Sequence, residues 1–484
     1  MAEESWHAAR LIPTSGINGA EEQERRATSA LLAVLAAVRE FGHALTKPLG
    51  APGGSVEAYI EVPFLCREKK LYPDGLIRVS RGQKTWTALV EVKTGNNTLA
   101  PEQLENYLDI AREQGFDAVL TISNEIPGVT GQHPTSIDRR KLRRVALHHL
   151  SWMQILAEAA MQKEFRGVAD PDQAWILGEL IRYLEHPRSG AMEFDDMSDG
   201  WVGIRDAVKS ATLRARDKGI AEVASRFDAL LRFAGLSLGR QIGTEVTPVL
   251  SRREVADPNV RSQGLVASLV ETGRLAGAIR IPATVGDMMV AADLRAGTVT
   301  CYVDVDAPRE GRSTTRVNWL VRQLKNAPEG LRIEAVAAYG RGSGAAELLR
   351  TVRENPATLV YDPTKELRTF RVALSTPMGA KRGRGRGSFI DSVLETIDVF
   401  YAEMMQHLKA WTPVPPRMRV QTSSEDAAEA QIPVALVSTA LSSQDGAEIG
   451  PVSATESFGA DADSEELDER LAGLDVEPGP TTSD

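Results

Sequence analysis

Hydrophobic positions near the amino end recur every three or four residues and then change to the alternating pattern of strands. The helical spacing covers 21–41 and predicts one amphipathic helix, with a buried stripe formed by Ala27, Leu31, Val34, Leu35 and Val38. Strand patterns rich in Val, Ile, Thr and Trp follow at 56–64, 74–80 and 85–93. A glycine-containing turn at 81–84 separates the last two, which predicts a β-hairpin.

The hairpin is followed by a helix and a further strand. Pro101 fits the first turn of a helix, and the apolar run 115–123 predicts a buried strand. Strands joined through a helix are expected to be parallel, with a right-handed crossover. The pattern predicts an α/β domain over 1–165, with a central mixed sheet flanked by helices.

The rest of the chain shows two further patterns of hydrophobic positions and then no regular pattern. A helical pattern over 171–236 predicts a connector over 166–240. An α+β domain over 241–412 is predicted from strands at 277–281, 298–305, 331–339 and 359–361, helices at 316–325 and 345–354, and a closing helix at 388–411. Prolines at 413–416 mark its end, and the polar, acidic segment 413–484 is expected to be disordered.

Acidic and basic side chains converge on the predicted hairpin. If Ser80 pairs with Thr85 across the turn, the register places Asp74 opposite Glu91, with the Cβ atoms of opposed residues roughly 4.5–5.5 Å apart. Lys93 lies two residues beyond Glu91 and therefore points to the same face. Two carboxylates this close are unfavourable unless a cation neutralises them, and Mg²⁺ is typically held by one or two carboxylates.

The hairpin residues resemble the PD-(D/E)xK signature of restriction-endonuclease-like nucleases. The resemblance rests on Pro73-Asp74 and Glu91-Val92-Lys93, followed by Gln103 and Tyr107, four residues apart on one face of the next helix. The last pair is similar to the extra motif of the exonuclease branch associated with recombination helicases, which is implied to contact DNA near the scissile phosphate. The resemblance covers about a third of the chain and implies a restriction-endonuclease-like fold for 1–165.

The resemblance also implies a role for the first helix, which in this family often supplies another acidic residue to the metal site. Glu24 is the candidate here, with Glu21 next. Both residues equally fit a simpler role, because carboxylates complement the positive end of a helix.

These residues together predict Mg²⁺-dependent phosphodiester hydrolysis, with Mn²⁺ as a substitute. Asp74, Glu91 and Glu24 would bind the metal, and Lys93 would serve the attacking water or the developing charge. Gln103 and Tyr107 would position the backbone of a nucleic acid, DNA in preference to RNA. Two alternatives stay open: an inactive nucleic-acid-binding or regulatory protein on the same fold, and a charged hairpin edge in which Lys93 merely offsets Glu91.

A second candidate site is the glycine-rich run from Tyr339 to Ala345. It partly fits G-x-G-x-x-A between a predicted strand and helix, and Asp362 follows at the place of an acidic ribose ligand. The run therefore suggests a nucleotide-binding protein as a further alternative. A plain turn, or a turn around a phosphate of nucleic acid, fits equally.

Basic residues form two clusters. The denser cluster consists of Lys381, Arg382, Arg384 and Arg386, which are interleaved with glycines. It predicts a flexible loop that follows the phosphate backbone of a nucleic acid without recognising its base sequence. The other is the run 139–144, for which an exposed charged loop is the commoner explanation. His148 and His149 are adjacent in a predicted strand, point to opposite faces and are interpreted as structural.

Composition and net charge limit the cellular environments and the partners that the sequence predicts. The sequence carries a formal net charge of −10. The segment 421–484 contributes about 15 acidic residues against one Arg, so the body is mildly basic and the tail acidic. No apolar run approaches the ~18–20 residues that cross a bilayer, no secretory signal is evident, and the two cysteines match no zinc or disulfide spacing. The expected setting is cytoplasmic and away from membranes, with nucleic acid as partner and either a homodimer or a protein bound through the tail.

Overall fold

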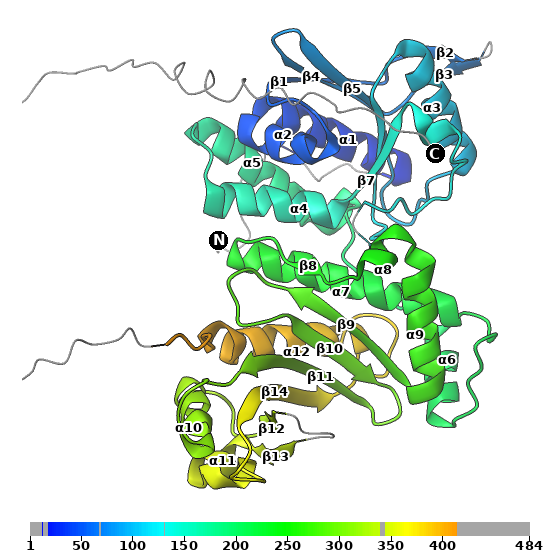
Figure 1. Cartoon of the computed structure of the whole chain (residues 1–484). Coiled ribbons are helices and arrows are strands. Elements are labelled where there is room, and N and C mark those ends of the chain that lie inside the picture. Colours follow the sequence, from blue (N-terminus) through cyan, green and yellow to red (C-terminus); the bar gives the residue numbers. More distant parts are fainter. Residues whose placement is uncertain (1–11, 13–17, 67–68, 130, 339–343, 414–484) are drawn as a thin grey trace, which may run out of the picture. The chain divides into compact units, whose positions relative to one another are not determined.

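The computed structural model describes residues 12, 18–66, 69–129, 131–338 and 344–413 of the chain (Figure 1). The chain divides into two units between Pro413 and Val414, and all described residues lie in the first. The residues Tyr339–Ser343 of the glycine-rich run and, apart from Pro413, the predicted acidic tail lie outside the described residues.

A five-stranded mixed sheet forms the N-terminal part of the fold, in the order β1-β4-β5-β6-β7 (Figure 1). The strands are β1 (Ser55–Ile60), β4 (Gly75–Arg81), β5 (Lys84–Val92), β6 (Ala118–Ser123) and β7 (Ala146–Ser151). The first three are antiparallel, and β5, β6 and β7 are parallel. The predicted hairpin register is confirmed, because Ser80 pairs with Thr85. The parallel arrangement of β5 and β6 is confirmed as well.

Helices cover both faces of this sheet. On one face α3 (Pro101–Gln114) packs through Tyr107 and Leu108 against Leu76 and Leu89 of the hairpin. The other face is covered by α1 (Ala20–Ala37), α2 (Arg39–Thr46) and α4 (Trp152–Met161). Pro101 occupies the first turn of α3 as predicted, because its missing N–H has no partner to lose there. The small hairpin of β2 (Phe64–Cys66) and β3 (Lys69–Leu71) lies between β1 and β4 in the sequence.

The prediction of one helix over 21–41 is wrong, because the chain bends between α1 and α2 at Val38. Val38 has extended backbone angles and is fully buried, and the helix axes differ by 108°. The bend brings Gly42 against Leu35, where a Cβ atom would lie 2.4 Å from the Leu35 carbonyl oxygen. Only glycine fits such a close approach. Among the described residues no single helix is long and apolar enough to cross a membrane, and α1 and α2 pass that test only as a bent pair.

A second, seven-stranded sheet is antiparallel throughout, in the order β13-β12-β14-β11-β10-β9-β8. Its strands are β8 (Thr247–Pro248), β9 (Arg274–Arg280), β10 (Met288–Asp293), β11 (Thr298–Asp306), β12 (Arg332–Ala337), β13 (Ala345–Leu348) and β14 (Leu367–Pro377). Helices α7 (Ile220–Ile242) and α12 (Phe389–Glu403) pack against it, and α7 also packs against α4. The remaining helices are α5 (Pro171–Leu184), α6 (Trp201–Lys209), α8 (Arg252–Ala256), α9 (Pro258–Thr272), α10 (Ser313–Gln323) and α11 (Leu349–Glu354).

Three details of this second part differ from the sequence prediction. The predicted strand 359–361 does not form, because Leu359 ends a 3₁₀ turn, Pro356–Leu359, and no strand follows it there. The predicted helix 345–354 begins as β13 and becomes helical only at Leu349, because Ala345–Leu348 pair with β12. Strands β10 and β14 were not predicted, although β14 lies between β11 and β12 and completes the sheet. Ladder pairing with other strands overrides local propensity in β13, β10 and β14.

Candidate active site

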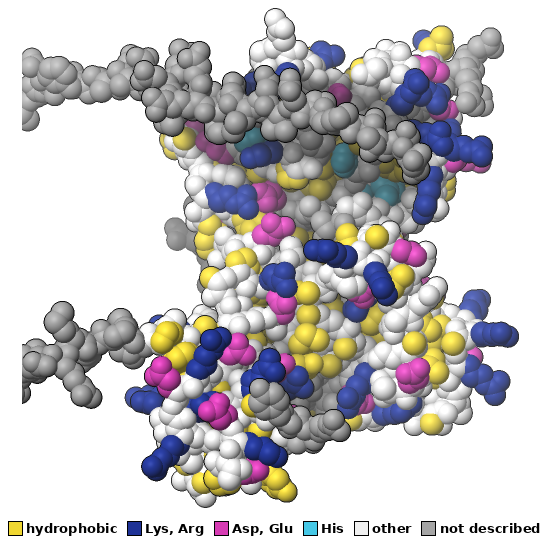
Figure 2. All heavy atoms as spheres, in the orientation of Figure 1, with side chains coloured by type: hydrophobic (Ala, Val, Ile, Leu, Met, Phe, Trp, Pro, Cys, Tyr) yellow, Lys and Arg dark blue, Asp and Glu magenta, His cyan; other side chains and the backbone are white. Residues whose placement is uncertain are grey.

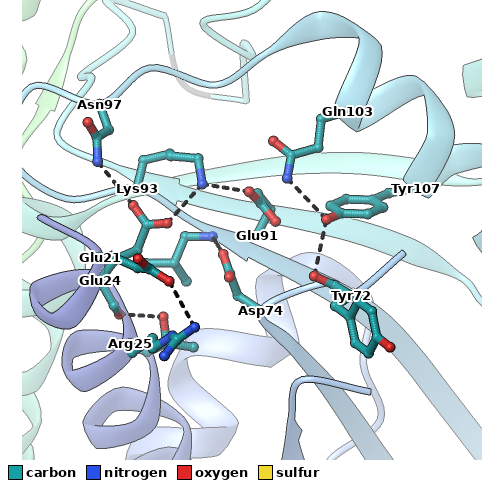
Figure 3. Close-up of polar contacts among 12 residues, drawn as sticks. Glu21, Glu24, Arg25, Tyr72, Asp74, Glu91, Lys93, Asn97, Gln103 and Tyr107 are labelled. Atoms are coloured by element: carbon teal, nitrogen blue, oxygen red, sulfur yellow. Dashed lines mark hydrogen bonds and ion pairs between the residues drawn. The ribbon is translucent and has the colours of Figure 1, made fainter. Parts of the chain in front are cut away.

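The predicted site residues of the hairpin lie together at one end of the first sheet (Figure 3). Asp74 immediately precedes β4, Glu91 lies in β5, and Lys93 follows directly after β5. The backbone N–H of Val92 donates a hydrogen bond of 2.7 Å to Oδ2 of Asp74. This bond fixes the Asp74 carboxylate against the strand that carries the other two residues.

Backbone contacts also hold Lys93 in place. Its N–H donates to the carbonyl oxygen of Ile122 in β6 at 2.7 Å, which extends the parallel ladder one residue past β5. Its own carbonyl oxygen accepts a hydrogen bond of 2.9 Å from the indole Nε1 of Trp152, a residue of α4 that is 1% exposed. The position of Lys93 is therefore determined by two neighbouring elements rather than by its strand alone.

The ammonium group of Lys93 lies between two carboxylates. Nζ is 2.7 Å from Oε1 of Glu91 and 3.0 Å from Oε1 of Glu24, which projects from α1 (Figure 3). Glu24 also accepts a hydrogen bond of 3.4 Å from Nδ2 of Asn97. The structure thus places Glu24 at the site, as expected. Glu21 instead forms an exposed ion pair of 2.8 Å with Arg25 on its own helix.

Burial makes the carboxylates of this site hard to ionise. Burial, followed by the neighbouring charge of Asp74, raises the pKa of Glu91 to about 8, against the opposing effect of Lys93. Burial also raises the pKa of Asp74 above its usual range. For Lys93, burial opposes the charged form, but the pairs with Glu91 and Glu24 prevail and raise its pKa. The lysine is therefore a fixed positive charge at neutral pH.

The donor set fits a divalent cation held by two carboxylates. Both oxygens of Glu91 are buried and accept no hydrogen bond of good geometry from the described residues, apart from the Lys93 ion pair. Within the described ranges no group of three or more His, Cys, Asp or Glu side chains is arranged to hold a metal. Asp74 and Glu91 with added water are therefore the ligands that the geometry offers, while Glu24 faces the ammonium of Lys93.

The two residues predicted to position a phosphate backbone lie on the adjoining helix. Nε2 of Gln103 donates to the hydroxyl oxygen of Tyr107 at 3.1 Å, and that hydroxyl donates a longer bond of 3.4 Å to the Tyr72 carbonyl oxygen (Figure 3). Burial, followed by the charge of Glu91, raises the pKa of Tyr107, which places the phenol beside the carboxylates. The pair borders the site, as the sequence predicted.

The basic cluster in the second part of the chain is partly engaged by acidic residues. Arg382 forms ion pairs with Asp196 at 3.3 Å and with Asp199, and Arg384 pairs with Glu193 at 3.1 Å and with Asp391. The predicted flexible loop is also tied down by its backbone, since the Met197 N–H donates to the Arg382 carbonyl oxygen at 3.0 Å. Within the described part of the chain, Lys381 and Arg386 form no ion pair and are exposed.

The surface around these clusters is mixed in charge. In the run 139–144, Lys141 turns inward to Asp109 at 3.0 Å and Glu105 at 3.4 Å, while the arginines are exposed. On the face shown in Figure 2, Lys and Arg side chains are interspersed with Asp and Glu.

The described residues that follow the glycine-rich run differ from those of a dinucleotide-binding motif. Ala345 begins a strand that pairs antiparallel with β12, where the motif requires the first turn of a helix. Asp362, the expected ribose ligand, accepts hydrogen bonds from Thr364 instead. The predicted helix does not begin at Ala345, so the described residues supply no helix N-terminus there to receive a phosphate, and nucleotide binding by this run stays a prediction.

The sequence prediction missed one polar cluster on the first sheet. The hydroxyl of Thr121 lies 2.8 Å from Nε2 of His133 and 2.9 Å from Nδ1 of His149. Nε2 of His149 lies 2.9 Å from the Glu125 carbonyl oxygen, so both of its ring nitrogens are used. Burial lowers the pKa of His149 to about 4, which keeps the ring neutral. No spacing in the sequence connects these residues, since β6, a loop and β7 supply one each.

No protein-family model matches the chain, and no curated protein matches it in sequence. Function is therefore inferred from the side chains themselves and from their geometry.

Proposed function

We propose that the chain is a metal-dependent nuclease that hydrolyses phosphodiester bonds, in DNA rather than RNA. The observation that carries the proposal is the position of the Lys93 ammonium, 2.7 Å from Glu91 and beside the anchored carboxylate of Asp74. Positive charge beside carboxylates that can hold a metal ion suits phosphodiester hydrolysis, and here the carboxylates are the buried Glu91 and the half-buried Asp74.

The order of the elements supports a restriction-endonuclease-like fold for the N-terminal part. A helix is followed by antiparallel strands β1, β4 and β5, then by α3 and the parallel strand β6. The acidic residues and Lys93 lie at the end of the hairpin, and α3 carries Gln103 and Tyr107 next to them. This agrees with the arrangement that the PD-(D/E)xK resemblance implies.

Asp74 and Glu91 would hold Mg²⁺, with Mn²⁺ as a substitute. When bound, the cation would lower the pKa of a water molecule and offset charge on the phosphate. Asp74 is held ready by the Val92 N–H, and Glu91 would lose the proton that its raised pKa favours. Lys93, held by Glu24, would stabilise negative charge on the phosphate, and the Tyr107 hydroxyl would position its backbone.

The alternative is a nucleic-acid-binding protein that does not cleave. The observation in its favour is that the Lys93 ammonium is engaged by two carboxylates at once, which describes a closed ion-pair network. A network of this kind holds α1 against the sheet without any chemistry.

Cleavage assays distinguish the two functions. Linear, circular and single-stranded DNA would each be incubated with Mg²⁺ or Mn²⁺. The proteins compared are the wild type, Glu91→Ala, Lys93→Ala and the control Lys84→Ala, which removes an exposed lysine of the same hairpin. We expect cleavage by the wild type and the control and none by the two site variants. Binding without cleavage under either metal would overturn the nuclease proposal.

A further inference from the structure

A cavity of about 400 Å³ lies away from the candidate active site, between α2, α4 and α7 and the strands β7 and β8. Its walls are largely apolar and include Leu45, Leu49, Leu150, Met161, Leu236 and Val246. None of the hairpin residues Asp74, Glu91 and Lys93 lines it. Cavities of this size and composition, with a few polar groups, are typical of sites for small organic molecules.

Arg232 of α7 is a largely buried positive charge of this cavity, and burial lowers its pKa against the opposing charge of the exposed Glu245. The Arg232 side chain is only 9% exposed. Nη1 donates to the Pro127 carbonyl oxygen at 3.2 Å, and Nη2 donates to Oε1 of Gln154 at 3.3 Å. Neither contact is an ion pair, and Arg232 forms no ion pair with any residue in the described ranges. A guanidinium group carries five N–H donors, so most of its capacity is unused.

The other buried arginine among the described residues, Arg316, has more partners than Arg232. Arg316 is 5% exposed, donates to the carbonyl oxygens of Gly311, Leu367 and Arg309, and lies 3.6 Å from Glu366. A buried charge without an ion pair is costly, so the two hydrogen bonds of Arg232 and the exposed carboxylate of Glu245 leave room for a partner of opposite charge from outside the chain.

A second polar group of the cavity is also without a partner. Nε2 of His148 is buried and forms no hydrogen bond with the residues that the structure describes. The acidic residues of the cavity form neither an ion pair with Arg232 nor a hydrogen bond with Nε2 of His148 among the described contacts. Glu158 is paired with Arg166, and Glu245 is exposed at the rim.

We propose that this cavity binds a small organic anion, a carboxylate or a phosphate monoester with a compact apolar body. The anionic head would contact the Arg232 guanidinium. A guanidinium is planar and can form bidentate hydrogen bonds with either a carboxylate or a phosphate. The leucines and Met161 would surround the apolar body. This site is separate from the proposed nuclease site and does not depend on it.

Calorimetric titration of the full chain tests the proposal, with hexanoate and hexyl phosphate as anionic probes and 1-hexanol as the neutral probe. We expect saturable binding of at least one anion and at least tenfold weaker binding of hexanol, because hydrogen bonds to a charged group contribute roughly 10- to 100-fold in affinity. Arg232→Met should weaken anion binding at least tenfold. The control Arg166→Met, which removes a paired arginine of the same cavity, should stay within about threefold of the wild type.

Two further variants keep the test decisive. Glu91→Ala should bind the anions like the wild type, and loss of binding in it would place the anions at the hairpin and overturn the proposal.

Arg232→Met should have an unchanged or higher melting temperature, since it removes an unpaired buried charge. If it does not fold, Arg232→Lys should weaken binding at least threefold through loss of the two-pronged contact. No binding of either anion by the wild type, equal binding of hexanol, or wild-type binding by the Arg232 variants would each overturn the proposal.

Discussion

The backbone N–H of Val92 holds the carboxylate of Asp74 at 2.7 Å, so the residue between Glu91 and Lys93 fixes the third member of the site. The contact joins the two strands of the hairpin at its open end, away from the turn. It leaves Asp74 with little freedom to turn away when charge or ligand changes nearby. An arrangement fixed before substrate arrives needs little reorganisation during the reaction.

Glu91 should make the stability of the protein fall with rising pH. Its folded-state pKa of about 8 lies above its usual value of 4.5, so the folded protein binds the proton more tightly than the unfolded chain. The stabilisation is complete below the unfolded pKa and is lost as the pH rises through the folded one. Glu91→Gln should therefore flatten the dependence of unfolding free energy on pH between about 5 and 9. Urea unfolding across that range is the measurement, and an unchanged slope in the variant would contradict the assignment.

Mg²⁺ should stabilise the wild type more at high pH than at low pH. Metal ligands must be deprotonated, and the raised pKa of Glu91 makes the cation compete with a proton. Thermal unfolding with and without Mg²⁺ should show a larger increase in melting temperature at about pH 9 than at about pH 6. Glu91→Gln and Asp74→Asn should lose most of this increase. Equal shifts in the wild type and both variants would show that the metal binds elsewhere.

Lys93→Met should abolish cleavage and also weaken the fold at alkaline pH. The substitution removes the counter-charge of Glu91 and Glu24, whose carboxylates lie 2.7 and 3.0 Å from Nζ. We expect a loss of cleavage rate on the order of 100-fold or more, because the charge that stabilises the phosphate is gone. Comparison with Lys84→Met, at the exposed end of the hairpin, controls for a general loss of positive charge. Wild-type cleavage by Lys93→Met would remove the lysine from the mechanism.

Tyr107→Phe should affect cleavage more than stability. The hydroxyl makes one bond of 3.1 Å with Gln103 and a long one of 3.4 Å with Tyr72, whereas the ring itself is packed in the core. Loss of these bonds should change the unfolding free energy by about 1 kcal/mol or less. If the hydroxyl positions the phosphate backbone, the cleavage rate should fall roughly tenfold. A melting temperature lowered sharply with an unchanged rate would indicate a purely structural hydroxyl.

The two pairs of cations in the 381–387 loop should behave differently in DNA binding. Lys381 and Arg386 are exposed and form no ion pair with the described residues, so alanine at both should weaken binding and reduce its salt dependence. Arg382 and Arg384 are already paired with acidic residues, so alanine there should change affinity less. Binding isotherms at several salt concentrations give both quantities. An equal effect of the two double variants would show that the ion pairs open when DNA binds.

Gly42→Ala should destabilise the protein through the bend between α1 and α2. The added Cβ would lie 2.4 Å from the Leu35 carbonyl oxygen and 3.2 Å from Cγ2 of Val56, which is overpacking that costs about 1–3 kcal/mol. The control is Gly203→Ala in α6, where a Cβ meets nothing within 4 Å and helix propensity favours alanine by about 0.5–1 kcal/mol. Denaturant unfolding of both variants tests the pair. A stable Gly42→Ala protein would mean that the bend relaxes easily.

The sequence by itself determined the hairpin, its register and the parallel strand that follows α3. Strand residues alternate between the two faces, so one turn with a glycine was enough to place Asp74, Glu91 and Lys93 at one patch. Helical spacing similarly placed Gln103 and Tyr107 on one face of α3. These relationships involve neighbours in the chain, and local backbone geometry fixes them.

Only the tertiary structure decided the features that depend on distant partners. The bend at Val38 exists because two helices pack against one sheet, and β13 is a strand because β12 lies beside it. The pairing of Glu24 with Lys93 spans α1 and β5, and the unpaired charge of Arg232 emerges only where α2, α4 and α7 enclose a cavity. Periodicity specifies which face a residue takes, whereas the partner that a buried charge meets, or lacks, depends on how separate elements pack together.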